Sequence, residues 1–309
     1  MKHLYRHVEE IGFNDIRVRL DRYTSKRDET SIIKNPIWFN YRFGDVIFFE
    51  DLKKDRPDLV WYADQDDDKS INYCDGGQES LTLIGDWKAG EIQKLVLALL
   101  VKELGKNDLF LSHGAVAWYR GLGVMFMTGE ENHGKTMCLI ESARRGGKII
   151  SCEGSVLDRD GHILQGTSDV FINVRLEGTE RSDKPSQEGW KIFFDSLPEF
   201  KRVEGKVGDV DLVILPSIDG HFDTAVTKLG QFEKEYQTFS CLSLSYFLSH
   251  ELISPKIPAP IIEDWDIRLK RARFTSSFAL KRPYFLVVAK NPQIVLDEVD
   301  NIIDGLNKK

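Results

Sequence analysis

The 309-residue chain has few cysteines and no long apolar run, and both shortages exclude classes of protein. Its four cysteines are scattered and form no Cys-x-x-Cys pair, which is typical of reduced thiols rather than of a disulfide framework or a zinc site. No segment approaches the roughly 20 apolar residues of a membrane-spanning helix. The first segment, MKHLYRHVEEIGFND, lacks the apolar core of a signal peptide. We therefore expect a cytoplasmic protein without a membrane partner.

The chain also lacks an excess of positive charge. Its 42 Lys and Arg side chains are outnumbered by 49 Asp and Glu, which gives a formal net charge of −7. Phosphate backbones select positive protein surfaces, so this balance disfavours a general nucleic-acid binder. Internal repeats and low-complexity segments are absent from the sequence. With 41% hydrophobic and 11% aromatic residues, the composition predicts an ordinary globular protein of one large domain or two unequal ones.

The pattern of apolar residues divides the chain into two regions. Residues 1–88 contain β-rich runs such as 16–20 and 45–51, which predict a small β-rich N-terminal region for substrate binding or assembly. Within it, the acidic run Asp66-Asp67-Asp68 suits a metal site or a hairpin tip. The hairpin tip is favoured because like charges this dense repel and stay solvated. An apolar stripe in residues 89–108 predicts a helix that opens the second region, residues 89–309.

Strands and helices alternate along this second region. We expect strands at 110–118 and 123–129 joined by a tight turn, a helix from 135, and a short strand at 148–153. A hairpin follows at 154–166 with Asp160-Gly161 at its tip, which is a strong turn dipeptide. A strand at 210–216 and a terminal strand and helix within 282–306 complete the pattern. This alternation predicts an α/β domain built on a mixed, twisted sheet.

The stretch GEENHGKT matches the phosphate-loop pattern G-x-x-x-x-G-K-[ST] through Gly129, Gly134, Lys135 and Thr136. A predicted strand ends at this stretch and a predicted helix follows it. In this order of elements the pattern indicates a phosphate-binding loop. Backbone N–H groups of such a loop and the positive end of its helix favour a polyphosphate. We expect Lys135 to reach the β- and γ-phosphates and the Thr136 hydroxyl to ligate Mg²⁺.

The variable positions of the loop are unusual. Glu130 and Glu131 add negative charge, which weakens nucleotide affinity unless they engage a basic group on the substrate. Main-chain amides do the binding in these loops, however, so both side chains can point away from the phosphates. Asn132 stands where many such loops have glycine, and asparagine tolerates left-handed conformations. His133 either contacts phosphate or lies exposed. The residues expected to bind ATP or GTP are Gly129, Glu130, Glu131, Asn132, His133, Gly134, Lys135, Thr136 and Met137.

Three features occur in a fixed order around the loop: a strand carrying His113-Gly114 before it, a helix ending in glycine after it, and then the strand Ile150–Glu153. In this order, residues 108–178 resemble the catalytic domain of HPr kinase/phosphorylase and related proteins. The C-terminal RPYFLVVAKNPQIVLDEV is similar to the ending of these proteins, whereas the first ~90 residues carry no resemblance that we recognise. The resemblance implies a fold similar to phosphoenolpyruvate carboxykinase. It also implies ATP- and Mg²⁺-dependent phosphorylation of a hydroxyl on a protein serine, a peptide or a small metabolite.

The resemblance also implies roles for single residues. Glu153 matches the second residue of the family's acidic pair and is expected to ligate Mg²⁺, to act as base, or to do both through water. Cys152 matches the first acid, the family's base, for which a thiol is a poor substitute; a small buried hydrophobe is its alternative reading. His113 is expected to contact the γ-phosphate or orient the acceptor, unless it only caps a strand end. Arg175 is expected to stabilise transferred charge, unless it is a surface residue.

Two alternatives to a kinase remain. Cys152 and the acidic loop favour a catalytically impaired nucleotide-binding pseudokinase, sensor or scaffold. A carboxykinase-like enzyme finds little support, because no clear second set of metal ligands or carboxylate-binding arginines is present. Asp219, His221 and Asp223 resemble a metal cluster, but their spacing after a strand end favours a polar loop. Assembly into a homo-oligomer is left open, and neither nucleic acid nor membrane is expected as a partner.

Overall fold

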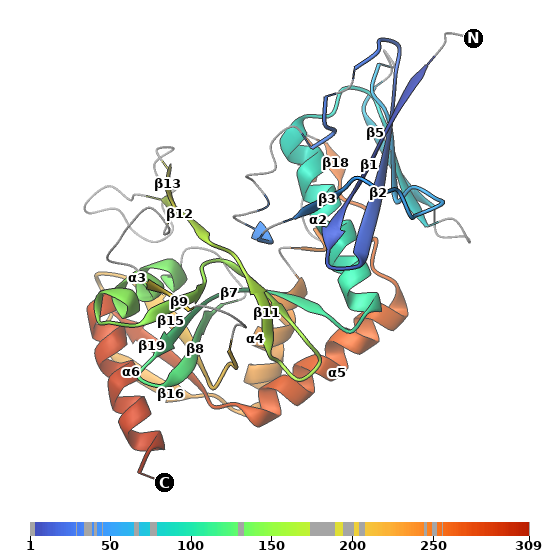
Figure 1. Cartoon of the computed structure of the whole chain (residues 1–309). Coiled ribbons are helices and arrows are strands. Elements are labelled where there is room, and N and C mark those ends of the chain that lie inside the picture. Colours follow the sequence, from blue (N-terminus) through green and yellow to red (C-terminus); the bar gives the residue numbers. More distant parts are fainter. Residues whose placement is uncertain are drawn as a thin grey trace. The chain divides into compact units, whose positions relative to one another are not determined.

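The computed structural model describes residues 4–28, 30–33, 39, 42–44, 46–64, 68–74, 79–128, 133–173, 189–193, 201–203, 208–243, 246–248, 252–254 and 256–308. The chain divides into two compact units (Figure 1). The first comprises Met1–Asn40, Asp45–Asp108 and Ser243–Lys270, and the second comprises Tyr41–Gly44, Leu109–Leu242 and Arg271–Lys309. Residues 89–108 and 243–270 thus group with the first unit, although the sequence pattern assigned them to the second region. The functions expected for the two regions stay predictions.

The first unit is built on a mixed sheet with the strand order β3-β1-β2-β4-β6-β5. Its strands are β1 (Tyr5–Phe13), β2 (Ile16–Thr24), β3 (Ile47–Phe49), β4 (Leu59–Tyr62), β5 (Ser70–Cys74) and β6 (Ser80–Ile84). The helix α2 (Ala89–Lys106) packs against β2 and buries its apolar stripe there. A small antiparallel pair, β17 (Leu252–Ser254) and β18 (Ile257–Pro258), completes the unit. The predicted β-rich N-terminal region and the helix after it are confirmed.

The second unit is built on a larger mixed sheet, whose main path runs β11-β10-β7-β8-β15-β19-β16, with β9 pairing β7 and β14. These strands are β7 (Phe110–Tyr119), β8 (Leu122–Met127), β9 (Lys148–Ser151), β10 (Gly154–Leu157), β11 (Ile163–Gly166), β14 (Lys201–Arg202), β15 (Leu212–Ile218), β16 (Ala225–Lys228) and β19 (Tyr284–Ala289). A separate antiparallel pair is formed by β12 (Asp169–Asn173) and β13 (Gly189–Phe193). The helices are α3 (Lys135–Arg144), α4 (Gln231–Ser243), α5 (Trp265–Lys281, in this unit from Arg271) and α6 (Pro292–Leu306).

Local chemistry explains where several of these elements begin and end. The predicted turn between β7 and β8 is confirmed, since Arg120 and Gly121 have φ values of 50° and 84°. Positive φ at both central residues defines the type I′ turn, whose twist suits a two-residue hairpin. The helix α6 starts at Pro292, and the side chain of Asn291 accepts a hydrogen bond from the N–H of Ile294 at 2.9 Å. Proline in the first turn and an asparagine cap both favour a helix start there.

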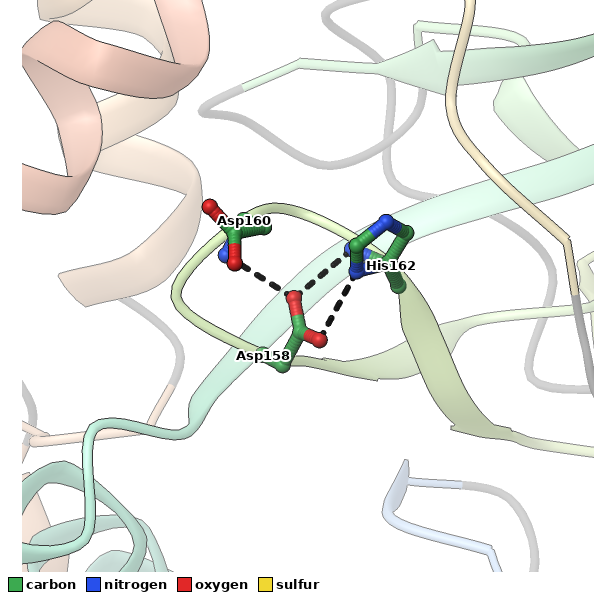
Figure 2. Close-up of side chains that lie close together, drawn as sticks. All are labelled: Asp158, Asp160 and His162. Atoms are coloured by element: carbon green, nitrogen blue, oxygen red, sulfur yellow. Dashed lines mark hydrogen bonds and ion pairs between the residues drawn. The ribbon is translucent and has the colours of Figure 1, made fainter.

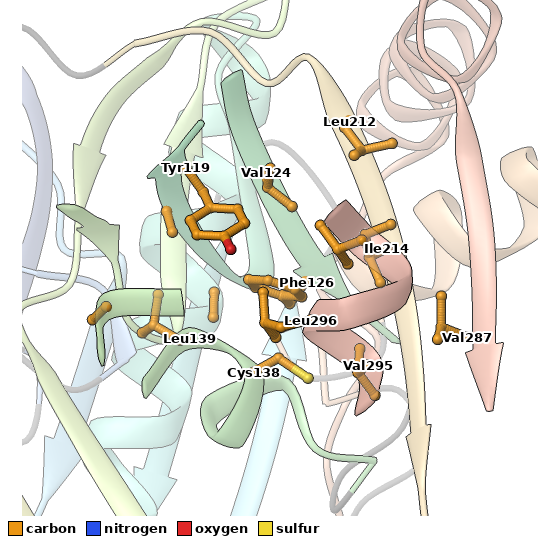
Figure 3. Packing of buried hydrophobic residues seen from close by; sticks show 14 of the residues in the cluster. Tyr119, Val124, Phe126, Cys138, Leu139, Leu212, Ile214, Val287, Val295 and Leu296 are labelled. Atoms are coloured by element: carbon orange, nitrogen blue, oxygen red, sulfur yellow. The ribbon is translucent and has the colours of Figure 1, made fainter. Parts of the chain in front are cut away.

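Alternate residues of the central strands enter two apolar cores, one on each face of the sheet. Tyr119, Val124 and Phe126 pack with Leu139 of α3 and Leu296 of α6 (Figure 3). Their sequence neighbours Val116 and Met125 pack on the other face with residues of α4 and α5. Because strand side chains alternate, this pattern requires helices on both faces. A mixed α/β fold is therefore confirmed for the second unit, whereas the HPr-kinase-like fold stays an expectation.

Three strands of this sheet run parallel, since β15 pairs in parallel with both β8 and β19. Their carboxyl ends therefore meet at one edge of the sheet, which is the edge where the loop after β8 lies. In α/β sheets, ligands bind outside the carboxyl ends of the strands. None of the helices in the described part of the chain is both long and apolar enough to cross a membrane.

Candidate functional site

The helix α3 begins at Lys135, where the phosphate-loop pattern predicts a helix start. Gly134 precedes it with φ of 100°, in the left-handed region that glycine favours. Within the described residues, no side chain caps this helix start and no acidic residue occupies the first turn. The first N–H groups of a helix lack intrahelical partners and carry partial positive charge. The start of α3 is therefore suited to an anion.

The other predicted loop residues divide into two groups. Gly129, Glu130, Glu131 and Asn132 lie outside the described residues, so their roles stay predictions. His133 and Thr136 are half-buried, and Met137 is exposed. A Cβ atom on Gly134 would lie 2.5 Å from Cδ1 of Ile218, the last residue of β15. The end of the loop is thus packed tightly against the carboxyl end of the neighbouring parallel strand.

Lys135 is buried, with only 7% of its surface exposed. Its Nζ donates a hydrogen bond to Oγ1 of Thr128, the residue that follows β8, at 3.2 Å. The ammonium group also acts electrostatically on His113 and Glu153, where it lowers the pKa of both. Lys135 therefore links the start of α3 to His113 and Glu153, which form the second part of the site.

That second part is a buried pair formed by His113 and Glu153, which are 6% and 7% exposed. Nε2 of His113 and Oε2 of Glu153 lie 2.9 Å apart. Strand pairing brings them together, since His113 of β7 lies opposite Gly154 of β10. On the other side of β7, the register with β8 pairs Gly114 with Met127, one residue before Thr128. Residues distant in sequence thus meet on three adjacent strands.

The electrostatics of the pair determine its protonation. Burial alone would raise the pKa of Glu153, but the hydrogen bond from His113 and the positive charges of Lys135 and Arg42 hold it below its ordinary range. Burial, followed by the charge of Lys135, lowers the pKa of His113 despite the contact with Glu153. Both lowered pKa values favour an ionised carboxylate and a neutral imidazole at neutral pH, and in that state the Nε2–H of His113 donates the hydrogen bond to Glu153.

The turn that carries Glu153 is held by Thr167, which follows β11. Its Oγ1 accepts hydrogen bonds from the backbone N–H groups of Glu153 and Gly154, at 2.8 and 3.0 Å. Its own N–H donates to the carbonyl of Gly154 at 2.9 Å, and its carbonyl accepts from the N–H of Cys152 at 3.0 Å. The side chain of Thr167 is fully buried. It fixes the backbone of Glu153, although no sequence motif pointed to it.

Of the remaining predicted catalytic residues, the structure describes Cys152. Cys152 is 1% exposed, and its side chain belongs to the apolar core around Phe126. This position fits the alternative reading of Cys152 as a small buried hydrophobe. Arg175 lies outside the described residues, so its expected role stays a prediction. The structure thus brings together His113, Glu153 and Lys135 from the predicted set.

A candidate metal cluster of Asp158, Asp160 and His162 lies at the tip of the β10–β11 hairpin (Figure 2). Their ligand atoms lie within 4.8 Å of one another. Oδ1 of Asp158 accepts the N–H groups of Asp160 and His162, both at 2.9 Å, and Oδ2 contacts Nδ1 of His162 at 2.8 Å. These bonds are typical of an aspartate that closes a turn. The sequence predicted the turn but not this convergence of side chains.

Among the residues that the structure describes, Asp219, His221 and Asp223 are not part of any group with three converging ligand atoms. Oδ1 of Asp219 instead accepts the N–H of His221 at 3.0 Å, which supports the polar-loop reading. Of the acidic run at 66–68, the first two residues lie outside the described residues and Asp68 is exposed.

Comparison of the chain with models of protein families and with curated proteins gives no match. The function is therefore inferred from the chemistry of the site. The start of α3 and the ammonium of Lys135 can bind an anion. The ionised carboxylate of Glu153 can hold a cation or accept a proton, while His113 keeps it oriented.

Proposed function

We propose that the protein is an ATP- and Mg²⁺-dependent kinase that phosphorylates a hydroxyl group on a peptide, a protein serine or a small metabolite. One arrangement carries the proposal: Lys135 lies buried at the start of α3, and its charge acts on the buried pair in which His113 and Glu153 lie 2.9 Å apart. A polyphosphate site and a carboxylate suited to hydroxyl chemistry therefore share one edge of the sheet. Phosphoryl transfer depends mostly on such positioning and charge.

The start of α3 fits the phosphates of a nucleotide. Gly134 adopts a left-handed conformation there, which aims the backbone N–H groups of the following residues in one direction. Ile218 packs against Gly134 and supports the turn from the sheet side. Lys135 then provides the ammonium group that contacts the β- and γ-phosphates in such sites. GTP carries the same phosphates, so these residues do not distinguish adenine from guanine nucleotides.

The donor atoms also fit Mg²⁺. The metal prefers hard oxygen ligands, and the Thr136 hydroxyl and the Glu153 carboxylate are of that type. The lowered pKa of Glu153 keeps this carboxylate ionised at neutral pH, as a metal ligand must be. When bound, Mg²⁺ would neutralise charge on the phosphate oxygens.

The proposed reaction transfers the terminal phosphoryl group to the acceptor. A bond forms between the acceptor oxygen and the γ-phosphorus, and the bond from that phosphorus to the β–γ bridging oxygen breaks. ADP leaves with the electron pair, and the hydroxyl proton passes to Glu153. His113 holds Glu153 through the 2.9 Å contact and so orients the accepting carboxylate. The loose transition state of phosphoryl transfer requires little base strength, so a carboxylate of low pKa suffices.

The position of Cys152 favours one alternative, a nucleotide-binding sensor or scaffold without transfer activity. Its thiol lies in the apolar core at the position where the resembled family has its base. In this alternative the loop binds nucleotide, while Glu153 and His113 only stabilise the fold. Both functions require nucleotide binding, and only the kinase requires Glu153 for turnover.

Thermal stabilisation by ATP and GTP, with and without Mg²⁺, tests both functions at once. Lys135→Ala should abolish the stabilisation, whereas Glu153→Gln should retain binding of the nucleotide phosphates and lose transfer to candidate hydroxyl acceptors. Cys152→Ala should retain both, which makes it the matched control on the same turn. If neither nucleotide raises the Tm of the wild-type protein, the kinase and the sensor are both rejected. Unchanged turnover in Glu153→Gln would remove Glu153 from the mechanism.

A further inference from the structure

The segment 42–44 comes from the N-terminal part of the chain, yet it belongs to the second unit. It contacts β10 and β11 at two glycines. A Cβ atom on Gly154 would collide with the carbonyl oxygen of Arg42, and one on Gly44 would collide with the side chain of Gln165. Gly44 has a φ of 103°, and the side chain of Phe43, the residue between Arg42 and Gly44, is fully buried. Two close glycine contacts and a buried ring thus anchor the segment beside the turn that carries Glu153.

This anchoring places Arg42 next to the candidate site. Arg42 lies against Gly154, and Gly154 both follows Glu153 and pairs with His113 across the sheet. The charge of Arg42 reaches both side chains, since it contributes to the lowered pKa of each. Lys135 acts on the same pair from α3, which follows β8 on the other side of β7. Two cations, Lys135 and Arg42, therefore act on the pair of His113 and Glu153.

We propose that Arg42 binds the phosphoryl group in transit beside the His113–Glu153 pair, together with Lys135. This inference rests on the proposed kinase function and adds a catalytic residue from a region that the sequence left without a site. A guanidinium can contact two phosphate oxygens at once and stays protonated throughout, so it suits this place better than an ammonium. During transfer the γ-phosphorus exchanges its bond to the bridging oxygen of ADP for one to the acceptor oxygen. The acceptor proton passes to Glu153, and Arg42 only stabilises charge.

Binding of two nucleotides that differ in the terminal phosphate tests this assignment. Arg42→Gln should weaken binding of the Mg²⁺ complex of β,γ-imido-ATP by roughly tenfold or more, since a charge-assisted hydrogen bond is lost. Binding of Mg²⁺–ADP should change little. Arg42→Lys should recover part of the loss. Equal binding of the imido nucleotide by the wild type and Arg42→Gln would overturn the inference, and so would an equal loss for both nucleotides.

A second measurement without nucleotide separates this inference from the proposed function. The ring signals of His113 in NMR spectra should shift in Arg42→Gln, because a neighbouring charge is removed. They should stay in place in the matched variant Arg159→Gln, whose side chain is 82% exposed at the β10–β11 hairpin. Absence of the shift would overturn the placement of Arg42. If the shift occurs but no nucleotide stabilises the wild type, the proposed function fails although Arg42 lies where the structure has it.

Discussion

At the scale of single residues, the pair of His113 and Glu153 makes the free energy of unfolding depend on pH. Both pKa values are lower in the folded protein than in the unfolded chain. On acidification the unfolded chain therefore takes up protons first, at about pH 6.5 for histidine and about pH 4.3 for glutamate. Stability from this pair is complete above about pH 7. It falls as the pH drops through these values, by up to about 1.4 kcal/mol per pH unit for each proton.

The variant His113→Gln isolates the histidine part of this effect. Glutamine retains an N–H donor for Glu153 but does not titrate, so its unfolding free energy should fall less steeply between about pH 6.5 and pH 5. Urea denaturation of both proteins at a series of pH values measures the difference. Parallel pH profiles would show that His113 titrates alike in the folded and the unfolded protein.

Thr167 provides a second test at this scale. Thr167→Val has nearly the same shape but leaves the N–H groups of Glu153 and Gly154 without their acceptor. A buried unsatisfied donor costs about 1–3 kcal/mol, so we expect a loss of at least that size in urea denaturation. Thr167→Ser retains the hydroxyl and should lose much less. Equal losses in the two variants would mean that the methyl group, not the hydroxyl, stabilises the turn.

The residues of the candidate site differed in how far the sequence could predict them. Lys135 stands in a local motif whose spacing was readable, whereas His113 and Glu153 were expected only from the resemblance of the surrounding segments. Thr167 and Arg42 reach the site through the pairing of β10 with its neighbours and through the docking of the segment 42–44. No local pattern encodes such contacts, because threonine after a strand and arginine in a loop are common. Only the assembled sheet shows that they lie beside the turn that carries Glu153.

At the scale of elements, the junction between the loop and α3 depends on glycine. Gly134→Ala should destabilise the protein by more than the roughly 1–2 kcal/mol of a left-handed non-glycine residue, since its Cβ would also crowd Ile218. It should also abolish stabilisation by nucleotide. Gly146→Ala, at the other end of α3, is the matched control. Its φ is 90°, but no described atom lies within 4 Å of the added Cβ, so only the conformational cost applies.

Thermal unfolding of both glycine variants with and without Mg²⁺–ATP measures these effects. Gly146→Ala should lose stability and keep the nucleotide response. If Gly134→Ala lost no more stability than Gly146→Ala and kept the response, the tight packing on Ile218 would not shape the loop.

The sequence predicted elements better than their arrangement. The hairpin of β7 and β8, the helix α3 and the final strand and helix follow from apolar periodicity and turn residues, which are local signals. The order of strands is not local. The insertion of β15 between β8 and β19 places residues 212–218 beside 124–126 and 284–289. Side-chain alternation specifies which face of a strand is buried, but not which strand lies beside it.

At the scale of the whole molecule, each of the two compact units is built from segments that are distant in sequence. Residues 41–44 cross into the second unit, and residues 243–270 return to the first. A boundary drawn after residue 88 from the pattern of apolar residues separates α2 from the sheet that covers it. Ile92, Leu95 and Val96 of this helix are buried in the first unit. Domain boundaries reflect contacts distant in sequence, which a local pattern of apolar residues does not report.

A truncated protein comprising residues 89–309 tests this division. It lacks β1 to β6, so the buried stripe of α2 would face water, and it lacks the segment with Phe43 and Arg42 that packs on β10 and β11. We expect it to retain helical signal but to bind a hydrophobic dye and to lose cooperative unfolding, because large exposed apolar patches are not tolerated in stable monomers. Circular dichroism, dye fluorescence and urea denaturation against the full chain measure this. Cooperative unfolding with an unchanged nucleotide response would instead make residues 89–309 an autonomous domain, and would remove Arg42 from nucleotide binding at the same time.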